Sequence, residues 1–171
     1  MGSKEIAVKD DGDGFRNLKT TQRGKVGERI VREHLKEKGW CVYAPSFDGS
    51  FPVDGFALRS KEGGFDVVVF EAKTYPRRFA HSQTGIDLAD FYTYKEIAQT
   101  LPLTIMFVDA FERCIYALNF REHSEKGVHE GGKVYFELEG MKKMRDLTRA
   151  ELNSIGWIES ASYRNVKRFF Q

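Results

Sequence analysis

The sequence feature that most constrains the fold is a short β-branched and aromatic run, FDVVVF at residues 65–70, which ends in the triplet Glu71-Ala72-Lys73. A run of this length and composition is typical of a buried strand. The glycine-containing segment 61–64 just before it predicts a hairpin turn, so a preceding strand should lie antiparallel to this one. Charges at the end of a buried strand are expected at the rim of a sheet, where they can meet water or a cation.

An acidic partner for Glu71 is expected on the preceding strand, residues 53–58, which carries Asp54. The hairpin brings Asp54 and Glu71 toward the same end, where they can pair across the strands. Hard cations such as Mg²⁺ prefer carboxylate, carbonyl and water oxygens. Lys73 beside the two carboxylates could orient a water molecule, and at a polar rim its loss should cost little stability. The simpler interpretation is that Glu71 and Lys73 are solvated charges on a strand.

A helix is expected over residues 25–38, because apolar residues recur there at helical spacing and Gly39 follows. The residues of this apolar face are Val26, Ile30, Val31 and Leu35. Glu28 lies at the edge of that face, from which it could point toward the site. It could equally be an exposed residue paired with Arg32 one turn on.

Further elements follow the same patterns. Asp87 is expected to cap a helix over residues 88–99, and Thr148 with Glu151 forms the sequence of a capping box for a short C-terminal helix. Strands are expected at residues 40–44, 103–109, 114–118 and 133–138, with loops at 45–51 and 74–83. A helix between strands requires a crossover, which predicts an α/β fold with a central mixed β-sheet flanked by helices.

Composition narrows the class of protein. The chain has 171 residues, of which 41% are hydrophobic and 30% charged, which is typical of one globular domain. We expect a flexible N-terminal arm over residues 1–22 and a single domain over 23–171. A net charge of +2 neither requires nor excludes a polyanionic partner. No apolar run is long enough to cross a bilayer, and a cytoplasmic location is expected.

The cysteines and histidines give no sign of a zinc site. Cys41 and Cys114 are expected to be buried, reduced thiols. The four histidines have no zinc-like spacing with each other or with the cysteines.

The order of helix, three strands, helix and further strands, with charges at these positions, resembles the PD-(D/E)xK nuclease superfamily. Glu28, Asp54 and the triplet Glu71-Ala72-Lys73 carry the resemblance, which covers residues 24–118. The segment from Gly27-Glu28 to Gly39-Trp40 is similar to the start of archaeal Holliday-junction resolvases and related restriction-type enzymes. Residues 119–171 lie outside the resemblance, so we expect them to be a C-terminal elaboration on a restriction-endonuclease-like core.

The resemblance implies a metal-dependent endonuclease that acts on DNA and leaves 5′-phosphate ends. It implies Glu28, Asp54, Glu71 and Lys73 as catalytic residues. It also implies Mg²⁺, with Mn²⁺ as a substitute, bound by Asp54, Glu71 and the Ala72 carbonyl, and by Glu28 through water or a second ion. Three alternatives stay open: an inactive binding module of the same fold, a nuclease for RNA, and an unrelated α/β protein. A homodimer is compatible with the sequence.

Residues that could bind a nucleic acid follow the triplet in the sequence. Tyr75, Arg77 and Arg78 come just after Lys73, and arginine binds phosphate with bidentate geometry. Gln83 and Lys95 could also contact the backbone of a nucleic acid, although a solvated charge is the simpler interpretation of Lys95. The C-terminal segment 163–170 interleaves basic and aromatic residues and is a second candidate for contact.

We predict that replacing Arg77 and Arg78 together with Ala weakens nucleic-acid binding for all sequences alike, because phosphate contacts carry no base identity. Two lost phosphate contacts should reduce the slope of log affinity against log salt concentration by about two units. Metal affinity should stay the same, since arginine is not a ligand. Binding measured across a salt series tests this, and an unchanged slope would shift attention to segment 163–170.

Overall fold

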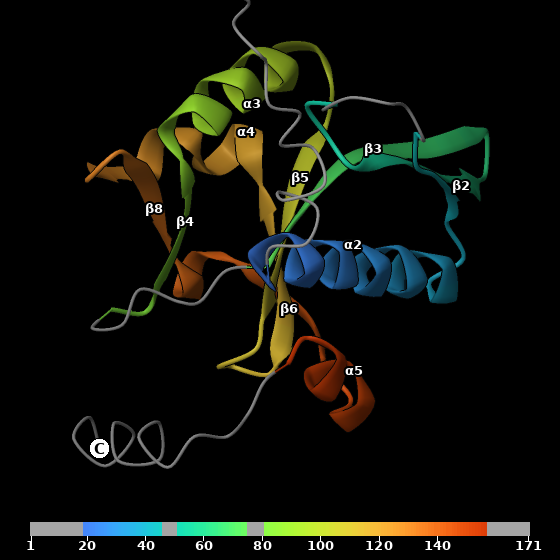
Figure 1. Ribbon diagram of the computed structural model, residues 1–171. Coiled ribbons are helices and arrows are strands. Elements are labelled where there is room, and N and C mark those ends of the chain that lie inside the picture. The colour runs from blue at the N-terminus through green and yellow to red at the C-terminus, as the bar shows by residue number, and fades with distance from the viewer. Residues whose placement is uncertain (1–18, 46–50, 75–80, 157–171) are drawn as a thin grey trace, which may run out of the picture.

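A computed structural model describes residues 19–45, 51–74 and 81–156 of the chain. A six-stranded mixed sheet, in the order β1-β2-β3-β5-β6-β9, forms the centre, and a three-stranded antiparallel sheet, β4-β8-β7, lies beside it (Figure 1). The strands of the central sheet are β1 (Cys41–Tyr43), β2 (Gly55–Lys61), β3 (Gly64–Lys73), β5 (Leu103–Asp109), β6 (Cys114–Asn119) and β9 (Lys142–Asp146). Those of the small sheet are β4 (Gln83–Asp87), β7 (Val128–Glu130) and β8 (Lys133–Glu137).

The described helices connect and cover these strands. They are α2 (Lys19–Glu37), α3 (Leu88–Thr100), α4 (Phe120–His123) and α5 (Arg149–Ser154), with 3₁₀ turns η1 (Ser124–Lys126) and η2 (Leu138–Gly140). Among the described residues, no helix is both long and apolar enough to span a membrane.

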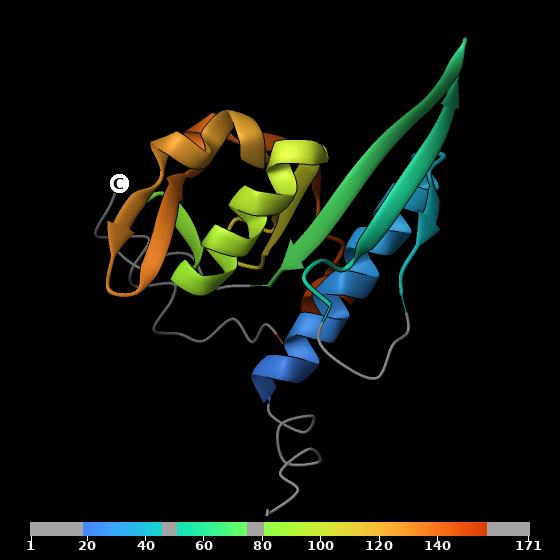
Figure 2. The ribbon, with the colours of Figure 1, turned by 90° about the horizontal axis from the view of Figure 1, so that it is seen from above.

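Strand β3 is the hub of the central sheet. It pairs antiparallel with β2 through the turn at Glu62 and Gly63, and parallel with β5 on its other side. The parallel pair requires a crossover, which β4 and α3 provide. The expected α/β fold, with a mixed sheet between helices, is therefore confirmed. Figure 2 shows the β2–β3 hairpin extending away from α3 at its turn end, while the end of β3 lies beside α3.

The two faces of the central sheet bury separate apolar cores. One core lies between the sheet, α3 and the small sheet, and includes Val69, Tyr94, Ile105, Phe107 and Phe136. The other lies against α2 and α5, and includes Ile30, Val31, Leu35, Phe70, Met106 and Ile155. Consecutive β3 residues point to opposite faces, so Val69 and Phe70 enter different cores. The apolar residues expected on one face of the first helix are indeed those that pack on the sheet.

Several elements differ from the sequence-based expectations. Helix α2 begins at Lys19, so residues 19–22, expected in an arm, are helical. Gly24 lies inside the helix, where a glycine costs only about 1 kcal/mol and does not end it. Strand β2 begins at Gly55, which leaves Asp54 just before the strand. Strands β4, β7 and β9 were not expected, because they are short and mostly polar and carry no clear apolar alternation. Cys114 is buried as expected, but Cys41 is exposed, because it lies on the short first strand at the edge of the sheet.

The C-terminal third is integrated into the fold. Strand β9 pairs with β6 in the central sheet, and β8 pairs with β4 in the small sheet. The capping box at Thr148 and Glu151 is confirmed. Asp87 stands at the N-cap position of α3 as expected, but its side chain pairs with Lys133 and makes no capping hydrogen bond.

Helix α2 approaches the end of β3 through a glycine. A Cβ atom at Gly27 would lie 1.7 Å from Oγ1 and 3.0 Å from Cβ of Thr74, the residue that follows β3. A Cβ atom at Gly24, one turn earlier on the same helix, would meet nothing within 4 Å. Only hydrogen at Gly27 therefore lets the helix lie this close to β3.

We predict opposite effects for alanine at these two glycines. Gly27→Ala should lower the free energy of unfolding by about 1–3 kcal/mol, because Thr74 or the helix must move. Gly24→Ala should raise it by about 0.5–1 kcal/mol, because alanine is the better helix former and has open space. Urea unfolding of both variants tests this, and equal stabilisation by both would contradict the close packing.

Candidate metal centre

The end of β3 places Glu71 and Lys73 on the face of the sheet that α3 covers. They alternate with Phe70 and Ala72, which enter the α2 core, and share the face of Val69. Glu71 is buried, and the Lys73 side chain is only 14% exposed. The sequence led us to expect a lysine at an open sheet rim. The structure encloses Lys73 more than that.

Asp54 lies at the edge of β3 where β2 begins. Its backbone N–H donates to the Phe70 carbonyl (3.1 Å), and its Oδ2 accepts from the Ala72 N–H (2.7 Å). The N–H and carbonyl of one strand residue point to the same side of the strand. The Ala72 carbonyl therefore points to the same edge as the Asp54 carboxylate.

In each of the two carboxylates, one oxygen forms hydrogen bonds or ion pairs with other groups of the protein. Oε1 of Glu71 accepts from the Tyr94 hydroxyl (2.9 Å) and pairs with Nζ of Lys73 (2.8 Å). Nζ of Lys73 also lies 2.8 Å from Oδ2 of Asp90. Within the described parts of the chain, Oε2 of Glu71 and Oδ1 of Asp54 have no hydrogen-bond or ion-pair partner. Each carboxylate thus offers one oxygen to a further ligand.

Burial and neighbouring charges shift the pKa values of the acidic groups and of the lysine at this site. Burial, and then the negative charge of Glu71, raises the pKa of Asp54 to about 7. Burial also raises the pKa of Glu71, although Lys73 opposes the shift. Burial alone would lower the pKa of Lys73, but the charge of Glu71 and the hydrogen bond to Asp90 raise it above its ordinary value. Lys73 is therefore protonated at neutral pH and acts as a charged hydrogen-bond donor.

Glu28 pairs with Arg32 and also acts on the site, so it fits both interpretations that the sequence left open. Its carboxylate lies 3.7 Å from Arg32 one helical turn on, as in the simpler interpretation. Its charge also contributes to the raised pKa of Asp54, so it lies close enough to act on the site electrostatically. About a third of its side chain is exposed, which leaves it accessible to water.

The donor set fits a hard divalent cation. Within residues 19–45, 51–74 and 81–156, no three His, Cys, Asp or Glu side chains are grouped closely enough to hold a metal by themselves. Asp54 and Glu71 offer two carboxylate oxygens, and the Ala72 carbonyl points to the same edge. Mg²⁺ is commonly bound by one or two carboxylates and several waters, so a third protein carboxylate is not required.

Two residues of α3 belong to this cluster and were not singled out as site residues from the sequence. They are Tyr94, which contacts Glu71, and Asp90, which contacts Lys73. Their spacing of four residues places them on one helix face, which is the only sequence signal that could have paired them. Which helix face meets the end of β3 depends on the tertiary fold.

The residues expected to bind a nucleic acid are not gathered at the candidate metal centre in the described part of the chain. Tyr75, Arg77 and Arg78 lie outside the described residues. Gln83 is buried at the start of β4, where its amide donates to Glu137 of β8 (2.5 Å). Lys95 pairs with Glu125 (2.8 Å), and its side chain is about half exposed.

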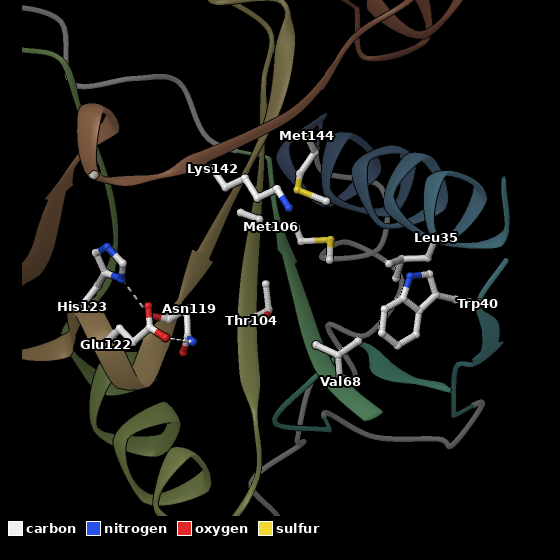
Figure 3. Close-up of a pocket in the computed structure, with 12 residues that line it drawn as sticks. Leu35, Trp40, Val68, Thr104, Met106, Asn119, Glu122, His123, Lys142 and Met144 are labelled. Atoms are coloured by element: carbon white, nitrogen blue, oxygen red, sulfur yellow. Dashed lines mark hydrogen bonds between the residues drawn. The ribbon is translucent and has the colours of Figure 1, made fainter. Parts of the chain in front are cut away.

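A separate pocket of about 420 Å³ lies on the α2 side of the sheet (Figure 3). Its apolar lining includes Trp40, Met106 and Met144, and Asn119 donates to Glu122 (2.7 Å) among its polar residues. Asp54, Glu71 and Lys73 do not line it. The pocket is therefore distinct from the candidate metal centre.

Comparison with known proteins gives little direct guidance. No family model and no curated protein matches the chain. One solved structure with a similar arrangement is Hjc from Archaeoglobus fulgidus, a Holliday junction resolvase from an archaeal hyperthermophile, with a TM-score of 0.46 and 9% sequence identity. The match covers 81% of this chain and 99% of the resolvase.

We predict that Asp54→Asn stabilises the metal-free protein at neutral pH. The pKa of Asp54 is raised from 3.8 to about 7, so its contribution favours the folded state at low pH and is lost as the pH rises through this window. The amide oxygen of Asn can still accept from Ala72. With a chelator present, the variant should match the wild type near pH 4 and exceed it by about 1–3 kcal/mol at pH 8.

Unfolding in urea at several pH values measures this difference. Glu62→Gln, at the exposed hairpin turn, is the matched control and should leave the pH dependence unchanged. A loss of stability in Asp54→Asn at pH 8 would contradict a repelling carboxylate pair.

Proposed function

We propose that the chain is a metal-dependent endonuclease that hydrolyses phosphodiester bonds in DNA and leaves 5′-phosphate ends. The observation that carries the proposal is the arrangement at the end of β3. Among the described residues, Asp54 and Glu71 each keep one oxygen without a partner, the charge of Glu71 raises the pKa of Asp54, and the protonated Lys73 lies beside Glu71. DNA is proposed as the substrate because the sequence resembles a superfamily of nucleases.

Each residue of the site would have a separate role in hydrolysis. Asp54, Glu71 and the Ala72 carbonyl would hold Mg²⁺, or Mn²⁺ in its place, and Glu28 would act through water or a second ion. When bound, the cation would polarise the scissile phosphate and lower the pKa of a bound water. Lys73 donates N–H groups that orient the attacking water and stabilise charge on the phosphate. The water would attack the phosphorus in line with the 3′ oxygen and expel that oxygen, so the phosphate would stay on the 5′ end.

A panel of labelled substrates tests the proposal. Single-stranded DNA, duplex DNA, a four-way junction and RNA are incubated with the full chain and Mg²⁺, Mn²⁺ or EDTA. Cleavage of a DNA substrate that depends on the metal supports the proposal, and cleavage of RNA alone would reassign the substrate. Failure of Mn²⁺ to raise the melting temperature, together with no cleavage, would indicate an α/β module without a metal site.

We predict that Lys73→Met lowers the cleavage rate by about a hundredfold or more, since it removes the charged donor beside the scissile phosphate. It should also cost about 1–3 kcal/mol of stability, because it leaves the buried Glu71 without its cationic partner. This stability cost is larger than the sequence suggested, since Lys73 contacts two carboxylates.

Single-turnover cleavage and urea unfolding measure the two effects separately. Lys61→Met, at the exposed end of the same hairpin, is the control and should cleave at the wild-type rate. A folded Lys73→Met variant with full activity would rule out this role for the lysine.

A further inference from the structure

We infer that Tyr94 and Asp90 of α3 are positioning residues of the candidate metal centre. Tyr94 fixes the orientation of the Glu71 carboxylate, and Asp90 fixes the ammonium group of Lys73. The inference rests on the proposed function, because both residues act through groups that the proposal places in the site.

The spacing of the four residues matches across the helix and the strand. Asp90 and Tyr94 are one turn apart on α3, which separates their Cβ atoms by about 6 Å. Glu71 and Lys73 are two residues apart on β3, which separates them by about 6.6 Å on one face. The two pairs therefore meet one to one, Tyr94 with Glu71 (2.9 Å) and Asp90 with Lys73 (2.8 Å).

Tyr94 is held rigidly enough to orient its partner. The residue is only 3% exposed, and its ring packs edge-on against Phe120 at 5.9 Å between centroids. Its hydroxyl and Nζ of Lys73 both reach Oε1 of Glu71, so this oxygen is fully engaged. Oε2 is then the oxygen that Glu71 presents to a cation, in a fixed direction.

Asp90 determines where the lysine charge sits. Nζ of Lys73 lies 2.8 Å from Glu71 and 2.8 Å from Asp90, so the ammonium is held between two carboxylates. The Asp90 side chain is 39% exposed, whereas that of Glu71 is 10% exposed. Asp90 thus draws the ammonium toward the accessible side of the site, where a phosphate would approach.

The test compares Tyr94→Phe and Asp90→Asn with the wild type in two measurements, Mn²⁺ binding followed by electron paramagnetic resonance and steady-state cleavage of the DNA substrate. Tyr94→Phe keeps the buried ring, and should weaken Mn²⁺ binding about tenfold or more. Asp90→Asn should lower kcat about tenfold with an almost unchanged Mn²⁺ affinity, because Asp90 does not contact a proposed ligand. KM for DNA should stay near the wild-type value in both variants.

Matched controls on the same helix are Tyr92→Phe and Glu96→Gln, both at exposed positions, which should behave as the wild type. Asp90→Glu should restore part of the lost kcat, which a purely structural role would not require. Wild-type values for Tyr94→Phe and Asp90→Asn would overturn the inference and leave the proposed function intact. A wild-type chain that neither binds Mn²⁺ nor cleaves DNA would instead overturn the proposed function, and the inference with it.

Discussion

The alternation of side chains along β3 is the constraint on which the rest of the structure depends. From Val69 to Lys73 the strand pairs with β5, and as far as Phe70 also with β2, and both its faces are covered, so successive residues point alternately to the α3 face and the α2 face. Phe70 and Ala72 fill the α2 core, which leaves Glu71 and Lys73 facing α3. A shift of one residue in register would turn both charges toward the α2 core and turn Phe70 and Ala72 toward α3. Packing of the cores therefore fixes the site.

The charges at this site are costly to the fold. Two neighbouring carboxylates are partly removed from water, and a single buried lysine is shared between one of them and Asp90. Such an arrangement is weak evidence for stability, because desolvation offsets much of the attraction within each pair. A divalent cation would relieve the repulsion, since it binds the ionised carboxylates. The conflict between local stability and charge placement is typical of functional sites.

The sequence predicted those parts of the fold that local patterns determine. The hairpin before β3 was recognised from its glycines, and the apolar face of α2 from its helical spacing, because neither depends on distant residues. The pairing of Asp54 with the end of β3 followed from the hairpin. Strand β9 was missed because its sequence, KKMRD, becomes a strand only by pairing with β6. Tyr94 was missed because its partner lies on another element.

The C-terminal third, to which the sequence assigned no role, holds α3 at both ends. At the start of the helix, Leu88 N–H donates to the Gly132 carbonyl (2.9 Å) beside β8. At its end, the Arg121 guanidinium donates to the carbonyls of Ala98 (2.8 Å) and Gln99 (3.1 Å), which the helix itself leaves free. Because α3 carries Tyr94, these contacts set the position of a hydroxyl that reaches Glu71. Residues that follow position 118 thus contribute to the candidate site indirectly, because they hold α3 in place.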